Sequence, residues 1–217
     1  MRDLCFFMRS ALFCLATIGT SFAAAPALQY RTIAGPSELW VFSSDGILAY
    51  SVESGAVRRV VLDETAETDS IVDVWQDESN VLWVSASSGL YSLDLAAGTR
   101  EKVPFVADQF TPGKITADYD YVWMASGHTL WQFDKLGREW FSYEIPSSGT
   151  QGVLGLYSDE DNVYCITASG AEAFSVLDEK WVSYPLSTGK IAPGAALRVD
   201  SDALVFVYGS TVQRFIY

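Results

Sequence analysis

Aspartates that recur at a fixed interval are the residues of this chain best suited to chemistry. Each pair is separated by one residue, and successive pairs lie 41 residues apart: Asp118 and Asp120, Asp159 and Asp161, and Asp200 and Asp202. Carboxylate oxygens are the ligands that hard cations such as Ca²⁺ prefer, so these residues are weak candidates for a cation site. Aspartate also stabilises turns, because its side chain accepts hydrogen bonds from nearby backbone amides. The pairs lack the dense ligand spacing of a calcium-binding loop, and the turn interpretation is therefore favoured.

Few other residues suggest catalysis. A glycosidase needs two carboxyl groups across the scissile bond, and the expected inner strands offer little besides Asp73 and Glu172. His128, the only histidine, lies in a turn-like segment and is a poor basis for a metal site or a catalytic triad. The sequence contains no phosphate-binding glycine loop and no metal-type pair of cysteines. We therefore expect no catalytic residue and no cofactor.

Each aspartate pair belongs to a repeat of about 41 residues. Apolar segments follow the aspartates, and their central residues are Trp40, Trp83, Trp123, Tyr164 and Val205. In the second repeat, apolar patterning predicts strands at 71–75, 81–86 and 90–94, and 100–105 is a polar fourth strand. Four short antiparallel strands with tight turns form one blade of a β-propeller, whose bulky residues pack between blades. The predicted fold class is all-β, a propeller of about five blades with four antiparallel strands each.

The repeat defines a single domain over residues 24–217. The blades are expected at about residues 28–63, 69–107, 114–147, 152–187 and 194–217. The last blade has only three strand-like segments and is expected to be three-stranded. Residues 28–34 could complete it or begin the first blade; we favour the first blade, because a missing inner strand would leave a hole along the channel. The unpaired edge of the last blade is then a candidate for self-association.

Residues 1–23 are predicted to be a secretory signal peptide. The apolar run at 11–18 is too short to span a bilayer, and small residues precede a cleavage site after Ala23. A start at Met8 would give a cleaner leader than a start at Met1. No other run approaches the roughly 20 apolar residues of a membrane span. We therefore expect no membrane span and a location in the periplasm or outside the cell.

The net charge narrows the classes of partner, and the cysteine content limits disulfide formation and thiol chemistry. The net charge of −13 repels nucleic acid and anionic lipid, so nucleic acid is not an expected partner. Cys165 is the one cysteine beyond the leader, which rules out an internal disulfide in the mature chain. Its strand-like apolar neighbours predict a buried, inert thiol.

The segment from Asp77 to Asp94 resembles the two-component-regulator propeller repeat. An acidic turn is followed by a strand centred on Trp83, small residues, a Gly-Leu-Tyr triplet and the closing Asp94. The third repeat looks similar, whereas the others keep less of the pattern. The resemblance implies a periplasmic, ligand-sensing propeller like those of membrane-bound histidine kinases. Because no kinase or DNA-binding segment is recognisable, it implies a fold and a tendency to bind a ligand, and not signalling.

These features favour a non-enzymatic binding or scaffold module for a protein or glycan partner. Binding residues concentrate on loops, and the longer loops are expected on the face opposite to the aspartates. The candidate ligand-binding residues on these loops are Phe110, Thr111, Ser147 and Ser148. Two alternatives stay open: a polysaccharide-acting enzyme, either a glycosidase or lyase-like, and a subunit of a larger exported assembly.

Overall fold

The computed structural model describes residues 31–35, 38–43, 45–62, 69–106, 110–146, 152–186, 191, 196–200, 203–208 and 211–216. The predicted signal peptide, its cleavage after Ala23 and the alternative start at Met8 lie outside these residues. All the regular secondary structure of the described part is β-strand. No helix in that part is long and apolar enough to cross a membrane.

Four of the sheets contain four antiparallel strands in sequence order, as the alternating patterns and tight turns predict. Their strands are β1 (Arg31–Ala34), β2 (Glu38–Ser43), β3 (Gly46–Ser51) and β4 (Val57–Val60); β5 (Ile71–Gln76), β6 (Val81–Ala86), β7 (Gly89–Asp94) and β8 (Thr99–Val103); β9 (Lys114–Ala117), β10 (Tyr121–Ser126), β11 (Thr129–Asp134) and β12 (Trp140–Glu144); β13 (Gly155–Ser158), β14 (Asn162–Thr167), β15 (Gly170–Ser175) and β16 (Lys180–Pro185). A further sheet contains β17 (Ala196–Asp200), β18 (Ala203–Tyr208) and β19 (Thr211–Ile216).

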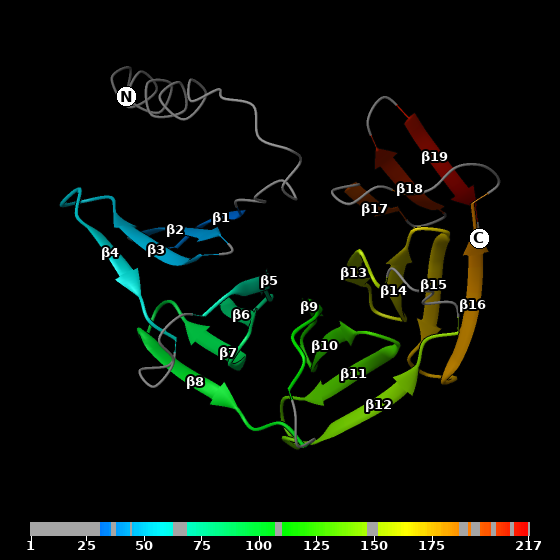
Figure 1. Cartoon of the computed structure of the whole chain (residues 1–217), viewed down its shortest axis with the longest axis horizontal. Coiled ribbons are helices and arrows are strands. Elements are labelled where there is room, and N and C mark those ends of the chain that lie inside the picture. The colour runs from blue at the N-terminus through cyan, green and yellow to red at the C-terminus, as the bar shows by residue number, and fades with distance from the viewer. Residues whose placement is uncertain are drawn as a thin grey trace.

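The sheets follow one another around a centre (Figure 1). The first strands β5, β9 and β13 lie innermost, and the last strands β8, β12 and β16 lie on the rim. Strand β9 contacts both β5 and β13, so the inner strands of three consecutive sheets adjoin. This radial order confirms the predicted all-β propeller. The number of five blades, with β17–β19 as the last, stays a prediction.

The N-terminal segment begins the first sheet. Arg31–Ala34 pairs antiparallel with β2, and Ile33 lies opposite Trp40. Ile33 is also part of the buried core. This pairing agrees with the interpretation that the segment supplies an inner strand of the first blade.

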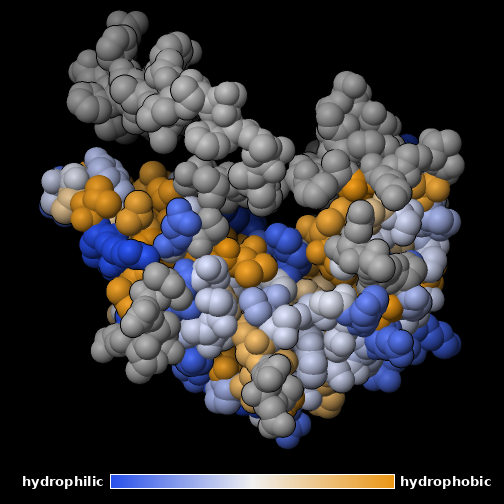
Figure 2. All heavy atoms as spheres, in the orientation of Figure 1, coloured by the Kyte–Doolittle hydropathy of each residue, from blue (hydrophilic) through white to orange (hydrophobic). Residues whose placement is uncertain are grey.

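The core fills the junctions between neighbouring sheets rather than one central space. Trp40 and Phe42 of the first sheet pack with Leu82, Val84 and Tyr91 of the second. The next junctions are filled in the same way by clusters around Trp83 and Phe133, and around Trp123 and Phe174. Figure 2 shows hydrophilic residues gathered on the rim beside β12 and β16. Side chains of the second and third strands therefore hold the sheets to one another, as expected for a propeller.

Cys165 lies in β14 and is fully buried. Burial raises the pKa of its thiol, and the nearby carboxylate of Glu172 on β15 raises it further. A thiol reacts as the thiolate, so both effects suppress its reactivity.

We therefore predict that iodoacetamide leaves Cys165 unmodified in the native protein and alkylates it after denaturation. Peptide mass spectrometry measures the labelled fraction at this position, independently of the two cysteines near the N-terminus. Rapid native labelling of the Cys165 peptide at neutral pH would contradict the buried placement.

Candidate binding site

The acidic turns between first and second strands share one hydrogen-bonding pattern. In each turn, the Oδ1 atom of the aspartate accepts two backbone amides. Asp77 accepts from Ser79 at 2.9 Å and Val81 at 3.0 Å. Asp118 accepts from Asp120 at 2.9 Å and Tyr121 at 2.7 Å, and Asp159 accepts from Asp161 at 3.0 Å and Asn162 at 2.7 Å. These bonds confirm the turn interpretation for the three aspartates.

The second oxygen of each carboxylate binds a ring from the following strand. The Oδ2 atoms of Asp77, Asp118 and Asp159 accept hydrogen bonds from Trp83 Nε1 at 2.9 Å, Trp123 Nε1 at 3.0 Å and Tyr164 Oη at 2.9 Å. The rings are buried between sheets, and a buried ring donor needs a partner. The five- or six-residue spacing in the sequence therefore reflects a direct side-chain contact.

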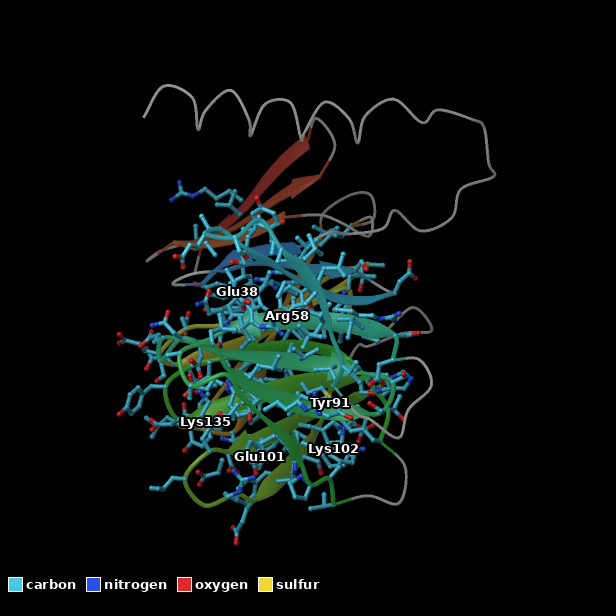
Figure 3. All side chains as sticks on the ribbon, turned by 90° about the vertical axis from the view of Figure 1, so that its left-hand side faces the viewer. Glu38, Arg58, Tyr91, Glu101, Lys102 and Lys135 are labelled. Atoms are coloured by element: carbon cyan, nitrogen blue, oxygen red, sulfur yellow. The ribbon has the colours of Figure 1, made fainter. Side chains whose placement is uncertain are left out.

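A lysine from the next sheet completes the turn of Asp77. Lys135 follows β11, and its Nζ atom lies 2.7 Å from Asp77 Oδ2 and 2.5 Å from the carbonyl oxygen of Asp118. The ammonium also lies over the ring of Trp83, 5.3 Å from its centroid. The Asp77 side chain is only 2% exposed and that of Lys135 is 17% exposed, so this is a largely buried ion pair between two sheets. Figure 3 shows Lys135 at the opposite end of the sheets from Lys102 and Tyr91.

A pocket among the described residues opens on the same face as the acidic turns. It has a volume of about 630 Å³ and is built from β5, β9, β13 and the turns that follow these inner strands. Five of the lining residues carry carboxyl groups: Glu78, Asp118, Asp120, Asp159 and Glu160. Four are aromatic: Trp75, Tyr119, Tyr121 and Tyr157. A pocket with this lining favours a ligand that is partly apolar and carries hydrogen-bond donors or positive charge.

The aromatic side chains of the pocket differ in exposure and in contacts. Trp75 is fixed, because its Nε1 atom donates to the carbonyl of Ala117 at 3.1 Å and its ring meets Tyr157 edge-on at 6.4 Å. Tyr119 is 71% exposed and stands at the rim. The pocket therefore combines a rigid apolar wall with a rim residue that can adjust to a ligand.

The predicted site residues do not lie together in the structure. Asp118, Asp120 and Asp159 line the pocket, and Asp161 lies beside it in the fourth-sheet turn. Phe110 packs edge-on against Phe105 at 5.1 Å, and Thr111 is exposed. Ser147, Ser148 and Asp202 lie outside the described residues, as does the side chain of Asp200. The pocket was not predicted, because its lining comes from three sheets whose proximity depends on the ring.

A cation site made of these aspartates stays a prediction. Among the described residues, no group of three or more His, Cys, Asp and Glu side chains is placed to hold a metal ion. The carboxylates of Asp118 and Asp159 each accept three hydrogen bonds within their own turns. A metal ion would have to compete for these oxygens with the backbone amides and the ring donors that they already bind.

The two carboxyl groups considered for glycoside hydrolysis lie on different kinds of strand. Asp73 is on the inner strand β5, but Glu172 is on β15, the third strand of its sheet, so its expected inner position is wrong. Glu172 is 4% exposed and accepts a hydrogen bond from Ser183 Oγ on β16. The order of pairing fixes β15 between β14 and β16. His128 remains in the turn after β10, where its carbonyl accepts the amide of Ile145.

Asp73 links two inner strands. Its Oδ1 accepts the amide of Val74 at 2.9 Å, and its Oδ2 accepts the amide of Ile115 on β9 at 3.1 Å. A register shift in β5 between Ile71 and Asp73 aims the side chain at the neighbouring sheet. Burial raises the pKa of this carboxyl, and the charge of Lys114, the two amides and Arg31 oppose that effect in part.

Comparisons with known proteins support the fold and leave the ligand open. No protein-family model and no curated protein matches the sequence. The extracellular domain of BT4673 from B. thetaiotaomicron, described as a one-component system, matches with a TM-score of 0.67, 13% identity and 92% of this chain covered. The extracellular domain of BT3049 from the same organism, described as a hybrid two-component system, matches at 0.62, 15% and 93%. A virginiamycin B lyase from Staphylococcus aureus matches at 0.62, 15% and 85%.

This chain spans 29%, 28% and 64% of the lengths of those three chains, respectively. At such identities the likeness shows the fold alone. The predicted resemblance to propellers of two-component regulators is confirmed at that level.

We predict that Asp77→Ala lowers the free energy of unfolding by about 3–5 kcal/mol, because it leaves the largely buried Lys135 ammonium without its counter-charge and the buried indole N–H of Trp83 without its acceptor. Asp159→Ala, which removes hydrogen bonds but no buried ion pair, should cost about 1–3 kcal/mol. The exposed Asp161 is the control, and Asp161→Ala should change stability by less than about 0.5 kcal/mol. Urea unfolding followed by tryptophan fluorescence measures all three. Equal losses for Asp77→Ala and Asp161→Ala would contradict this role of the ion pair.

The raised pKa of Asp73 predicts a pH dependence of stability. The folded state binds the proton of this carboxyl more tightly than the unfolded state, whose pKa is about 3.8. Its contribution to stability is therefore greatest at low pH and declines as pH rises from about 4 through the folded-state pKa. The difference in unfolding free energy between the wild type and Asp73→Ala should shrink over this range. A difference that grows with pH would contradict the raised pKa.

Proposed function

We propose that the protein is a non-enzymatic binding or scaffold module, a propeller of five blades that is exported to the periplasm or the cell exterior and binds a protein or glycan. The observation that carries this proposal is the pocket over β5, β9 and β13, with its wall of aromatic rings and its carboxylates. Such a concave site on a rigid scaffold is the general form of a recognition site. The extracellular domains with the same fold add support for a location outside the cytoplasm.

The geometry favours binding over catalysis. Asp73 and Glu172 accept hydrogen bonds that hold strands together, and neither is among the residues that line the pocket. The pocket aspartates Asp118 and Asp159 have both carboxylate oxygens engaged in turn and ring contacts. A carboxyl group held in this way orients a turn and does not serve readily as an acid or a nucleophile.

A lyase is the second candidate, because a virginiamycin B lyase has the same fold. The structure of that enzyme carries a histidine-to-alanine substitution described as catalytically inactive. The one histidine of this chain, His128, does not line the pocket. This difference favours the binding module.

The architecture of the propeller completes the proposal. The signal peptide would comprise residues 1–23, and the five blades would extend from about residue 28 to the end of the chain. The sheet β17–β19 would be the last blade, with β19 as its outer strand. An outer strand with one open side can pair with another chain, so the protein could also be a subunit of a larger exported assembly.

The test is a binding screen on peptide and glycan arrays with a matched pair of variants. Tyr119→Ala combined with Asp120→Asn alters two exposed pocket residues, whereas Leu136→Ala alters a side chain that is 95% exposed and lies outside the pocket lining. We predict a ligand that binds the wild type and Leu136→Ala and loses at least tenfold in affinity for the pocket variant. Melting temperatures check that both variants fold.

Two results would overturn the proposal. One is a ligand set that the pocket variant and the wild type bind equally well. The other is turnover of a polysaccharide or of virginiamycin B by purified protein that is lost on substitution of a pocket carboxylate.

A further inference from the structure

The first junction considered lies between the second and third sheets, and the second junction lies between the third and fourth sheets. Within the third sheet, the amide of Lys135 donates to the carbonyl of Asp120 at 3.0 Å. Within the fourth sheet, the amide of Val176 donates to the carbonyl of Asp161 at 2.9 Å. Lys135 and Val176 each follow the third strand of their sheet and lie 41 residues apart. They are therefore equivalent positions of the repeat.

At the first junction, the ammonium of Lys135 occupies a defined niche. It binds the carboxylate of Asp77 and the carbonyl of Asp118, and it lies over the ring of Trp83. The protein thus shows which chemical group this niche accepts: a primary ammonium on a flexible alkyl chain.

At the second junction, the corresponding acceptors are present and the lysine is absent. Asp118 is the equivalent of Asp77 one repeat further on, and Asp159 is the equivalent of Asp118. The acceptors at the second junction are therefore the carboxylate of Asp118 and the carbonyl of Asp159. Val176 stands where the lysine would be, and it has no donor in its side chain. Asp77 is buried beneath Lys135, whereas Asp118 and Asp159 are half-buried and line the pocket together with Val176.

The surroundings of this second niche also favour positive charge. Glu78, Asp120 and Glu160 add carboxylates to the pocket, and no Lys, Arg or His is among the residues that line it. Arg31 on the inner strand β1 stacks on Trp75 and donates to the carbonyl of Val74, so this cation is already engaged. Tyr119 and Tyr157 offer apolar surface for the methylenes of an alkyl chain. The net charge of −13 attracts a basic partner to the surface.

We propose that the pocket binds a lysine side chain of a protein partner, with its ammonium in the position at the second junction that Lys135 occupies at the first. This inference rests on the proposed function as a binding module and names the ligand chemistry of the same pocket. The partner presents a lysine on an extended or protruding segment, because the pocket is concave and lies at the turns of the inner strands.

The experiment uses the full chain and a pair of terminally blocked peptides of identical sequence, one with free lysines and one with acetylated lysines. Acetylation removes the charge but keeps the alkyl chain. Isothermal titration at low ionic strength should show saturable binding of the free-lysine peptide and at least tenfold weaker binding of the acetylated one. Equal binding of the two peptides would overturn the proposal.

The matched variants are Val176→Lys and Val182→Lys. Val176→Lys supplies the missing ammonium from within and should reduce the affinity for the lysine peptide at least tenfold, with an unchanged or raised melting temperature. Val182 lies on the outer strand β16, is 51% exposed and is outside the pocket lining, so Val182→Lys makes the same charge change elsewhere. An equal loss in both variants would overturn the proposal, because it would show dependence on net charge alone.

Two further measurements separate the possible failures. If 1,5-diaminopentane displaces the lysine peptide at an equal or lower concentration, the ligand is a small amine and the assignment of a protein partner is wrong. If the lysine peptide does not bind but an array ligand still depends on Tyr119 and Asp120, this inference fails and the binding module stands. If no ligand depends on the pocket, both fail.

Discussion

The hydrogen bond between a turn aspartate and a buried ring is the interaction on which the rest of the structure depends. A tryptophan or tyrosine between two sheets contributes a large apolar area, but its ring N–H or O–H must find a partner. Asp77, Asp118 and Asp159 supply that partner from the turn that precedes the ring's own strand. The same carboxylate orders the turn through two amides. One residue thus fixes the reversal of the chain and the position of the side chain that packs against the next sheet.

Contacts between inner strands continue this order around the ring. The indole of Trp75 donates to the carbonyl of Ala117, and the carboxylate of Asp73 accepts the amide of Ile115, so β5 is tied to β9 twice. Thr116 and Ser158 tie β9 to β13 through their hydroxyl groups at 3.0 Å. These polar bonds lie at the inner ends of the apolar junctions. The inner strands therefore form a fixed frame, and the turns that follow them are held at defined positions relative to one another.

The local parts of this arrangement could be read from the sequence. The 41-residue interval, the turn aspartates and the alternation around Trp83 predict the strands and their order within each sheet, because these features depend on residues close in the chain. The ion pair of Lys135 with Asp77 joins residues that are 58 positions apart and has no local signal. The pocket likewise depends on three sheets. Glu172 was expected on an inner strand, but the pairing of β15 with β14 and β16 makes it the third strand of its sheet.

A repeat protein can acquire a specific site where its repeats cease to match. The backbone at Lys135 and at Val176 is the same, because both amides bond to the carbonyl of an equivalent turn aspartate. This backbone bond is the same for lysine and for valine, so it does not determine which side chain stands at this position. The side chain lies beside the turns of two neighbouring sheets. Where the side chain is lysine, the acceptors are satisfied internally and Asp77 is buried. Where it is valine, the same acceptors face a pocket with carboxylates and aromatic rings around them. The two junctions thus differ in the side chain at this position of the repeat, lysine at one and valine at the other, and a periodic sequence pattern does not by itself reveal the consequence of that difference.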